Sequence, residues 1–308
     1  EGDTMTSLSQ KILENYQVRK TAKQKSAFIQ LMQQNFPDMI VEEGGFPKCR
    51  NLIVGDVNNA QLILTAHYDT CAKLLFPNFI MPKNPLASIL YSVLLVVPMV
   101  AAIYLVNILL SFITADFWAH YLVSLIAYIA LFLLMIAGPA NKNTANDNTS
   151  GVIVLCELLQ LLTPELRNKV AFVFFDHEET GLIGSSYFRS KHKDLAKERL
   201  LLNFDCVSDG DYLLVSATKA ARNTYGTLIR DAFLPAEGKT ILFTKAEHTY
   251  YPSDQIGYKT SVAIAALKRK RFLGYYMDRI HTSRDTIFDK ENIKLICDSI
   301  LRLIKTIS

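Results

Sequence analysis

The stretch that decides the fold is VAFVFFDHEETGLIGSSYF, residues 170–188. Its first part is an uninterrupted apolar run up to Phe175, which is typical of a strand buried on both faces of a sheet. The run breaks abruptly into the segment DHEE, residues 176–179, and two glycines follow. Three carboxylates and an imidazole at the end of a buried strand indicate a functional site at the carboxyl edge of a sheet.

The rest of the chain alternates between strand and helix patterns. Helix patterns cover 5–36, 151–162 and 289–307, and strand patterns cover 39–43, 50–55, 61–68, 169–175, 201–205, 212–217 and 261–267. Strands that alternate with helices predict an α/β fold. We therefore expect a mixed, largely parallel central sheet flanked by helices.

Residues 84–137 interrupt this pattern. Two runs within them, 86–113 and 117–137, contain no Lys, Arg, Asp or Glu. Each reaches the roughly 20 residues that a helix needs to cross a membrane. A hairpin buried in a soluble core is the alternative, but soluble helices of this length nearly always carry a polar face. We expect a transmembrane helical hairpin inserted into one catalytic domain, which comprises 1–83 and 138–308.

The charges around this hairpin predict its orientation. Lys73, Lys83 and Lys142 lie near its base, whereas the turn carries only Asp116. The positive-inside rule then places the catalytic domain in the cytoplasm of a cell-membrane protein with two spans. The lipid bilayer is accordingly an expected partner.

Composition excludes several other classes. The 308 residues carry a formal net charge of +4, which with no nucleic-acid motif gives no reason to expect a nucleic-acid partner. The five cysteines form no close pairs, so we expect a reducing compartment. We expect the basic residues within 11–25 and 268–271 on the solvated surface, with contact to a membrane surface as the alternative.

Polar residues that suit metal binding recur at the ends of the apolar runs and in two loops. Each has an ordinary structural explanation when taken alone, but the set has a common chemistry: His67, Asp69, Asp147, Glu178, Glu179, Asp205 and His281. Imidazole and carboxylate ligands suit Zn²⁺ or a similar divalent ion. Two imidazoles and three carboxylates can hold two ions when one carboxylate bridges them, and a hydroxide then brings the charge to zero.

The ordered motifs resemble a known family. They are His-Tyr-Asp at 67–69, Asn-Asp-Asn-Thr-Ser-Gly at 146–151, Glu-Glu-Thr-Gly-Leu-Ile-Gly-Ser at 178–185, Asn-Phe-Asp at 203–205 and His-Thr at 281–282. Together they resemble the zinc aminopeptidases of the bacterial leucyl aminopeptidase and aminopeptidase Y type, metallopeptidase family twenty-eight. The resemblance covers about residues 50–70 and 140–290, and the apolar hairpin lies outside it.

The resemblance implies a role for each ligand residue. His67 and Asp205 would hold one zinc ion, Glu179 and His281 would hold the second, and Asp147 would bridge them. Cobalt or manganese could occupy the same ligands. The presence of both His67 and Asp205 favours two ions.

It also implies the catalytic groups. Glu178 would be the general base that takes a proton from metal-activated water, and Asp69 would orient His67. Asp176 and His177 are interpreted as structural. Gly181 and Gly184 are expected to let the backbone turn tightly against the sheet.

The substrate pocket is predicted less directly. Tyr250, Tyr251 and Asp254 are candidate substrate-binding residues, although Gln255 stands where relatives often carry a histidine. Ile280 stands where some relatives carry a tyrosine. The implied activity is an aminopeptidase for peptides with a free N-terminus, hydrophobic peptides among them. The alternatives are a glutaminyl-cyclase-like acyltransferase with one zinc ion and a non-catalytic peptidase-like scaffold.

Overall fold

A mixed sheet forms the centre of the protein. The computed structural model describes residues 5–74 and 76–307. Over these residues the sheet has nine strands, with β9 paired to β8 beside the path β1-β2-β4-β3-β5-β8-β6-β7. The strands are β1 Ile40–Gly44, β2 Cys49–Val54, β3 Leu62–His67, β4 Val170–Phe175, β5 Leu200–Phe204, β6 Tyr212–Ala217, β7 Thr240–Lys245, β8 Ser261–Lys270 and β9 Gly274–Tyr276.

Four neighbouring strands in the middle of the sheet run parallel. These are β4, β3, β5 and β8, while β1 and β2 add antiparallel strands at one side. At the other side β6 is antiparallel to β8 and parallel to β7. The predicted mixed, largely parallel sheet is confirmed, and the carboxyl ends of its central strands lie along one edge.

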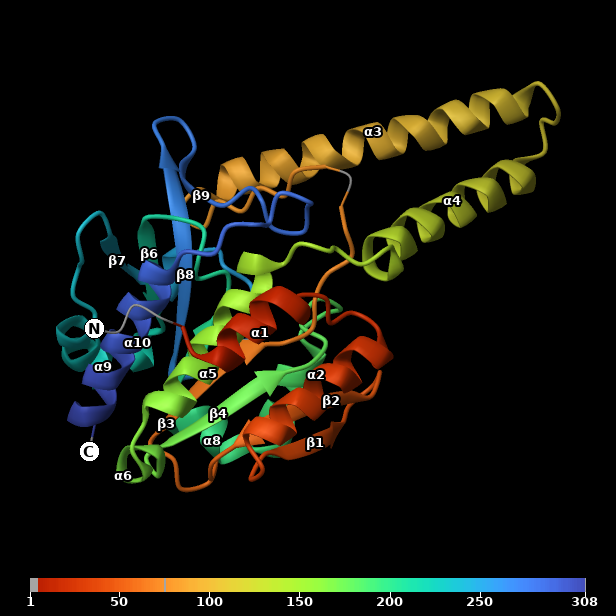
Figure 1. Cartoon of the computed structure of the whole chain (residues 1–308). Helices are drawn as coiled ribbons and strands as arrows, with labels where there is room; N and C mark the ends of the chain where they lie inside the picture. Colours follow the sequence, from red (N-terminus) through yellow and green to blue (C-terminus); the bar gives the residue numbers. More distant parts are fainter. Residues whose placement is uncertain (1–4, 75, 308) are drawn as a thin grey trace.

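Helices cover both faces of the sheet (Figure 1). One face packs against α1 Ser7–Asn15, α2 Ala22–Asn35, α5 Gly151–Leu161, α9 Lys219–Ala232 and α10 Lys290–Thr306. The other face packs against α7 Ile183–Lys191 and α8 Lys193–Glu198. The short helix α6, Pro164–Arg167, leads into β4.

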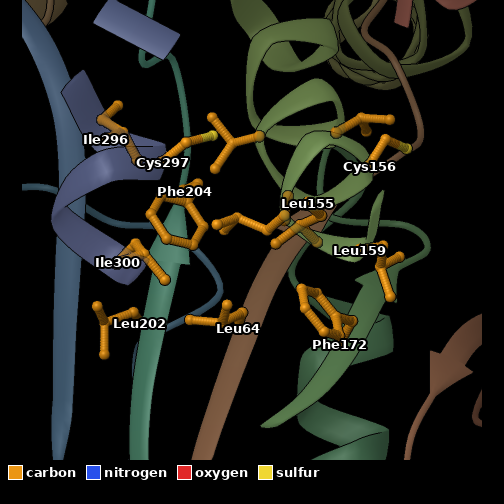
Figure 2. Close-up of a cluster of buried hydrophobic side chains, with 14 of the residues drawn as sticks. Leu64, Leu155, Cys156, Leu159, Phe172, Leu202, Phe204, Ile296, Cys297 and Ile300 are labelled. Atoms are coloured by element: carbon orange, nitrogen blue, oxygen red, sulfur yellow. The ribbon is translucent and has the colours of Figure 1, made fainter. Parts of the chain in front are cut away.

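The two faces of β4 explain its unbroken apolar sequence. Val170, Phe172 and Phe174 join the core under α5 and α10, whereas Val173 and Phe175 join the core under α7. Successive side chains of a strand point to opposite faces, so a strand covered on both sides needs apolar residues throughout. Figure 2 shows side chains of α5 and α10 meeting those of β3, β4 and β5 in the larger core.

The N-terminal region differs from the prediction of one helix over 5–36. It forms two helices, because α1 ends at Asn15 and α2 begins at Ala22. Between them the chain turns inward, and the fully buried Arg19 donates from Nε to the carbonyl oxygen of Tyr68 at 2.5 Å. Lys25 is also buried. The expectation that the basic residues of 11–25 lie on the solvated surface is therefore wrong at these two positions.

Two long apolar helices, α3 Pro85–Ser111 and α4 Phe117–Ala137, project from the body as a hairpin (Figure 1). Both are long and apolar enough to cross a membrane. The first ends two residues earlier than the predicted 86–113, because the chain turns at Phe112. Between the helices, Asn107 Nδ2 donates to Ser124 Oγ at 2.8 Å. These polar groups thus find partners within the hairpin.

Candidate metal centre

The predicted ligand residues meet at the carboxyl edge of the sheet. His67 is the last residue of β3, and Asp205 directly follows β5. Glu178 and Glu179 follow β4, which pairs in parallel with β3 so that Phe175 lies opposite His67. Segments outside the sheet supply the other two residues. Asp147 lies in the kinked helical segment η1, Ala145–Ser150, directly before α5, and His281 lies in the loop before α10.

His67, Asp147 and Asp205 form one buried group. His67 Nε2 lies 3.4 Å from Asp147 Oδ1 and 3.4 Å from Asp205 Oδ1. Two ligand atoms about 2.1 Å from a tetrahedral zinc ion are separated by about 3.4 Å. The three side chains therefore fit a zinc ion in both residue type and spacing.

His281 and Glu179 form a second group beside the first. His281 Nε2 lies 3.2 Å from Glu179 Oε2 and 2.9 Å from Asp147 Oδ2. Asp147 thus turns one carboxylate oxygen toward each histidine. That is the arrangement in which a single carboxylate can bridge two ions.

The electrostatics of the cluster fit cations as well. Burial would lower the pKa of His67, but Glu178 and the hydrogen bonds with Asp147 and Asp205 raise that pKa well above its usual value. The pKa of His281 is raised in the same sense: burial opposes the shift, and Glu179 contributes most to it. A raised pKa at both histidines means that the carboxylates around them carry more negative charge than the site neutralises. Divalent cations bound there would offset this excess negative charge.

Glu178 lies beside both groups. Its carboxylate is within 4.8 Å of ligand atoms of His67 and Glu179. Burial raises the pKa of Glu178 well above its usual value, and Glu179 and Asp254 add to the shift while His67 opposes it. A carboxylate with a raised pKa beside a metal position is suited to accept and return a proton.

Asp69 connects the first group to the turn after β4. Its Oδ1 accepts from the backbone N–H of Glu178 at 3.0 Å, and its Oδ2 accepts from that of Glu179 at 3.3 Å. His67 Nδ1 lies 3.1 Å from the carbonyl oxygen of Asp69 and 3.7 Å from its carboxylate. The Asp69 carboxylate therefore fixes the backbone of Glu178 and Glu179. The backbone carbonyl oxygen of Asp69, rather than its carboxylate, is the nearer partner of the His67 imidazole.

The turn after β4 depends on its two glycines, as expected. Gly181 has φ +116, which side chains disfavour. Gly184 donates its N–H to the carbonyl oxygen of Asp176 at 2.9 Å, and a Cβ on Gly184 would lie 2.2 Å from that oxygen. The close approach brings the start of α7 against the strand end and fixes the path of residues 177–180.

Backbone strain gathers around the centre. Within the described residues, positive φ angles at non-glycine positions occur at His177, Leu182, Cys206 and His281. His281 is a predicted ligand, Cys206 follows one and His177 precedes Glu178. Such conformations cost about 1–3 kcal/mol each and persist where the surrounding structure enforces them, often at functional sites.

Sequence reasoning missed three supporting residues. Asp285 accepts the backbone N–H groups of Asn146 and Asp147 at 2.8 and 3.0 Å, so it holds the segment that carries the Asp147 carboxylate. Burial raises the pKa of Asp285 to about 8. Arg19 places a buried cation behind the cluster, where its Nη1 donates to Thr149 Oγ1 at 3.1 Å. The third residue is Cys71, which with Glu179 and His281 forms a further group of possible metal ligands.

A cavity of about 210 Å³ opens onto the second group. Asp69, Cys71, Glu179 and His281 line it together with Lys20 and Lys25, while Leu74 and Ile136 form apolar walls. Ile136 belongs to α4, and its carbonyl oxygen accepts from Lys20 Nζ at 2.6 Å. The base of the apolar hairpin is therefore part of the cavity wall.

The three predicted substrate-binding residues differ in exposure and in contacts. Tyr251 is buried, and its hydroxyl donates to the carbonyl oxygen of Asp205 at 3.0 Å. Tyr250 is 58% exposed and lines a separate cavity of about 260 Å³ with Tyr251 and Gln255. Asp254 is fully buried, neither of its carboxylate oxygens has a hydrogen-bond partner, and burial raises its pKa to about 7.

The comparisons with known proteins agree with this picture. Residues 128–304 match Peptidase family M28. An 82-residue stretch is 39% identical to probable leucine aminopeptidase 2 of Aspergillus oryzae, and it covers 26% of this chain but only 16% of that relative. The LapA aminopeptidase of Legionella pneumophila has a similar fold, with a TM-score of 0.55, 12% identity, and coverage of 98% of this chain and 70% of LapA. Porphyromonas gingivalis glutaminyl cyclase gives a TM-score of 0.58, 17% identity, and coverage of 97% and 96%.

The fold and the edge-of-sheet cluster define the α/β class to which M28 exopeptidases belong. Since the family match spans more than half of the chain, this chain belongs to peptidase family M28, a family of peptide hydrolases. The matched range contains Asp147, Glu179, Asp205 and His281. His67 precedes that range and joins the other residues only through the pairing of β3 with β4 and β5.

Proposed function

We propose that this protein is a membrane-anchored aminopeptidase that uses two zinc ions to remove N-terminal residues from peptides. The observation that carries the proposal is the pair of adjacent ligand groups that share Asp147, with Glu178 beside them. Family membership supports peptide hydrolysis. The residue types, the spacing near 3.4 Å and the surplus of negative charge support divalent ions, and zinc is the ion that these ligands suit best.

The residues divide the work as follows. His67 and Asp205 would hold one ion, Glu179 and His281 would hold the other, and Asp147 would be shared between them. Zinc ions bound there would supply polarisation of the scissile carbonyl and a water acidic enough to act as a nucleophile near neutral pH. Glu178 accepts the proton of the attacking water and passes it to the leaving amine. Asp69 holds the backbone of both glutamates in place.

A glutaminyl-cyclase-like reaction is the second candidate, because the fold is also that of a glutaminyl cyclase. Ion stoichiometry separates the two proposals. Two ions per chain support the aminopeptidase, whereas one ion and cyclisation of an N-terminal glutamine would support the cyclase.

We also propose that 84–137 is an inserted transmembrane hairpin and that 1–83 and 138–308 form one catalytic domain. Apolar side chains on several sides of both helices support this assignment. Leu94 and Val96 of α3 are 64% and 53% exposed, and Phe132 and Leu134 of α4 are 62% and 49% exposed. An apolar surface this extensive is costly in water. The lysines near the base and the five free, buried cysteines support a cytoplasmic catalytic domain.

The hairpin base suggests a preference for hydrophobic peptides. An apolar cavity of about 120 Å³ lies between α3 and α4 and is lined by Leu95, Met99, Leu131 and Leu134. Leu74 lines both this cavity and the one that opens onto Glu179 and His281. A peptide with its free amino end at the metal centre could therefore place apolar residues against the hairpin.

The test of function is amino-acid release from free and N-blocked peptides by purified protein. We expect release from free termini only, and a 10²–10⁴-fold loss of kcat in Glu178→Gln, the range for removal of a general base. The matched control is Glu165→Gln, an exposed residue of α6 that should leave the rate unchanged. Full activity in Glu178→Gln with both ions bound would exclude Glu178 as the base.

The test of substrate preference replaces 84–137 by a short Gly/Ser linker. We expect the rate on long hydrophobic peptides to fall relative to that on short ones. Equal rates on both classes in the soluble form would mean that the hairpin serves only as an anchor.

A further inference from the structure

Cys71 lies in the second ligand group. Its Sγ, a Glu179 carboxylate oxygen and a His281 imidazole nitrogen are all within 4.8 Å of one another. Cys71 is 3% exposed and lies on the wall of the 210 Å³ cavity that contains both partners. The set has the residue types and the spacing of a metal site, which holds for none of the other cysteines in the described residues.

Two groups of this cluster have no hydrogen-bond partner in the described residues. The Glu179 side chain is only 7% exposed, and its buried Oε1 has no hydrogen-bond partner. Over residues 5–74 and 76–307, the Cys71 thiol makes no hydrogen bond either. By contrast, the Cys206 thiol donates to Asp205 Oδ1 at 3.1 Å. A buried carboxylate oxygen without a partner is costly, and a cation would satisfy it.

The backbone fixes the position of this thiol. The carbonyl oxygen of Cys71 accepts from the N–H of Asn141 at 3.1 Å, and the N–H of Leu74 donates to the carbonyl oxygen of His281 at 2.8 Å. The segment 71–74 is thereby attached to the loop of His281 on one side and to the chain returning from the hairpin on the other. The extension of β3 that follows the predicted ligand His67 thus places the Cys71 thiol beside Glu179 and His281.

We propose that Cys71 is a further protein ligand of the ion that Asp147, Glu179 and His281 hold. This inference rests on the proposed two-ion centre. Binding replaces the thiol proton by the metal, so one S–H bond breaks, one sulfur–metal bond forms and a proton passes to water. One site is then bound by nitrogen and oxygen only, whereas the other includes a soft thiolate.

The proposal makes the two sites chemically different. Thiolate ligands favour zinc over manganese or magnesium, so the site with Cys71 should discriminate against the harder ions. The other site, built from His67, Asp147 and Asp205, lacks that preference. A mixed loading of the two sites with different metals is therefore an expected property of this chain.

The experiment loads the full-length protein in detergent with cobalt and records its near-ultraviolet absorption. We expect two ions per chain and a thiolate-to-cobalt charge-transfer band in the wild type and in Cys297→Ser, a matched buried control that belongs to no ligand group. The band should be absent in Cys71→Ser, and the second cobalt should bind at least tenfold more weakly. Two bound ions without the band, or a band that survives Cys71→Ser, would overturn the assignment of Cys71 as a ligand but not the two-ion function. Fewer than two bound ions would overturn the two-ion function and this inference with it.

A second measurement needs no variant. Alkylation of the wild type, mapped by mass spectrometry, should modify Cys71 at least tenfold faster after metal removal, while Cys49, Cys156 and Cys297, which belong to neither ligand group, keep their rates. The same Cys71 rate with and without metal would also overturn the assignment.

Discussion

The buried pair of Lys25 and Asp176 gives a stability prediction that does not depend on metal. Lys25 Nζ lies 2.7 Å from Asp176 Oδ1, and the two side chains are 7% and 1% exposed. Asp176 also accepts the backbone N–H groups of Arg50 and His177, each at 3.0 Å. Lys25 therefore neutralises a carboxylate that holds both β2 and the start of the turn carrying Glu178.

Replacing this lysine should leave a buried charge without its counter-ion. Removal of one partner of a buried pair costs about 3–5 kcal/mol. Because two backbone N–H groups still bind the Asp176 carboxylate, we expect Lys25→Met to fall at the lower end, about 3 kcal/mol. For a domain of this size that corresponds to a drop in Tm of roughly 6–12 °C. Methionine retains helix propensity, so α2 itself should persist.

The assay is thermal unfolding followed by circular dichroism in detergent. Lys23→Met, an exposed position of the same helix, is the control and should change stability by about 0.5 kcal/mol or less. The double variant Lys25→Met/Asp176→Asn should recover part of the loss, because it removes the stranded charge. A loss below about 1 kcal/mol in Lys25→Met, or strictly additive effects in the double variant, would refute the reasoning.

Three further outcomes are expected. Gly184→Ala should cost about 1–3 kcal/mol of stability and weaken metal binding, because the new Cβ would lie 2.2 Å from the Asp176 carbonyl oxygen. The control is Gly226→Ala, whose Cβ would have no neighbour nearer than 3.9 Å, and equal Tm values for the two variants would contradict the prediction. Metal removal by a chelator should lower Tm by an amount equivalent to about 2.7 kcal/mol when the free ion had been at 100 times its Kd, and an unchanged Tm would count against a bound ion. A cysteine introduced by Ala115→Cys at the hairpin turn should react with an impermeant thiol reagent on intact cells, whereas one introduced by Lys142→Cys should react only after lysis. The reverse labelling pattern would invert the proposed topology.

The sheet was predictable from the sequence because its central strands are covered on both faces. An unbroken apolar run such as 170–175 leaves few alternatives, and the polar residue that follows each run marks the same edge of the sheet. The edge strand β7 and helix α9 escaped prediction. Their apolar residues are sparse because solvent covers part of each element, as the 37% exposure of Phe243 indicates.

The centre was predictable to a different extent for different residues. Ligand candidates could be found because each ends a strand or stands in a recognisable motif. Asp285, Arg19 and Cys71 could not, because their roles depend on contacts with residues far away in the sequence. Arg19 lies in a basic stretch that resembles solvated surface, and only its burial against Tyr68 distinguishes it.

The position of the hairpin relates the proposed membrane anchor to the candidate metal centre. The insertion lies between His67 and Asp147, and isolated bridges pair Ala72 with Ala140 and Ile80 with Met277 around its base. The second bridge precedes His281 by only a few residues, and Leu74 joins the same loop through the carbonyl oxygen of His281. A displacement of α3 or α4 would therefore reach a predicted ligand through backbone hydrogen bonds rather than through flexible side chains. Because the bridges close the base independently of the helices, the centre should persist without the hairpin, while the apolar wall formed by Ile136 would be lost.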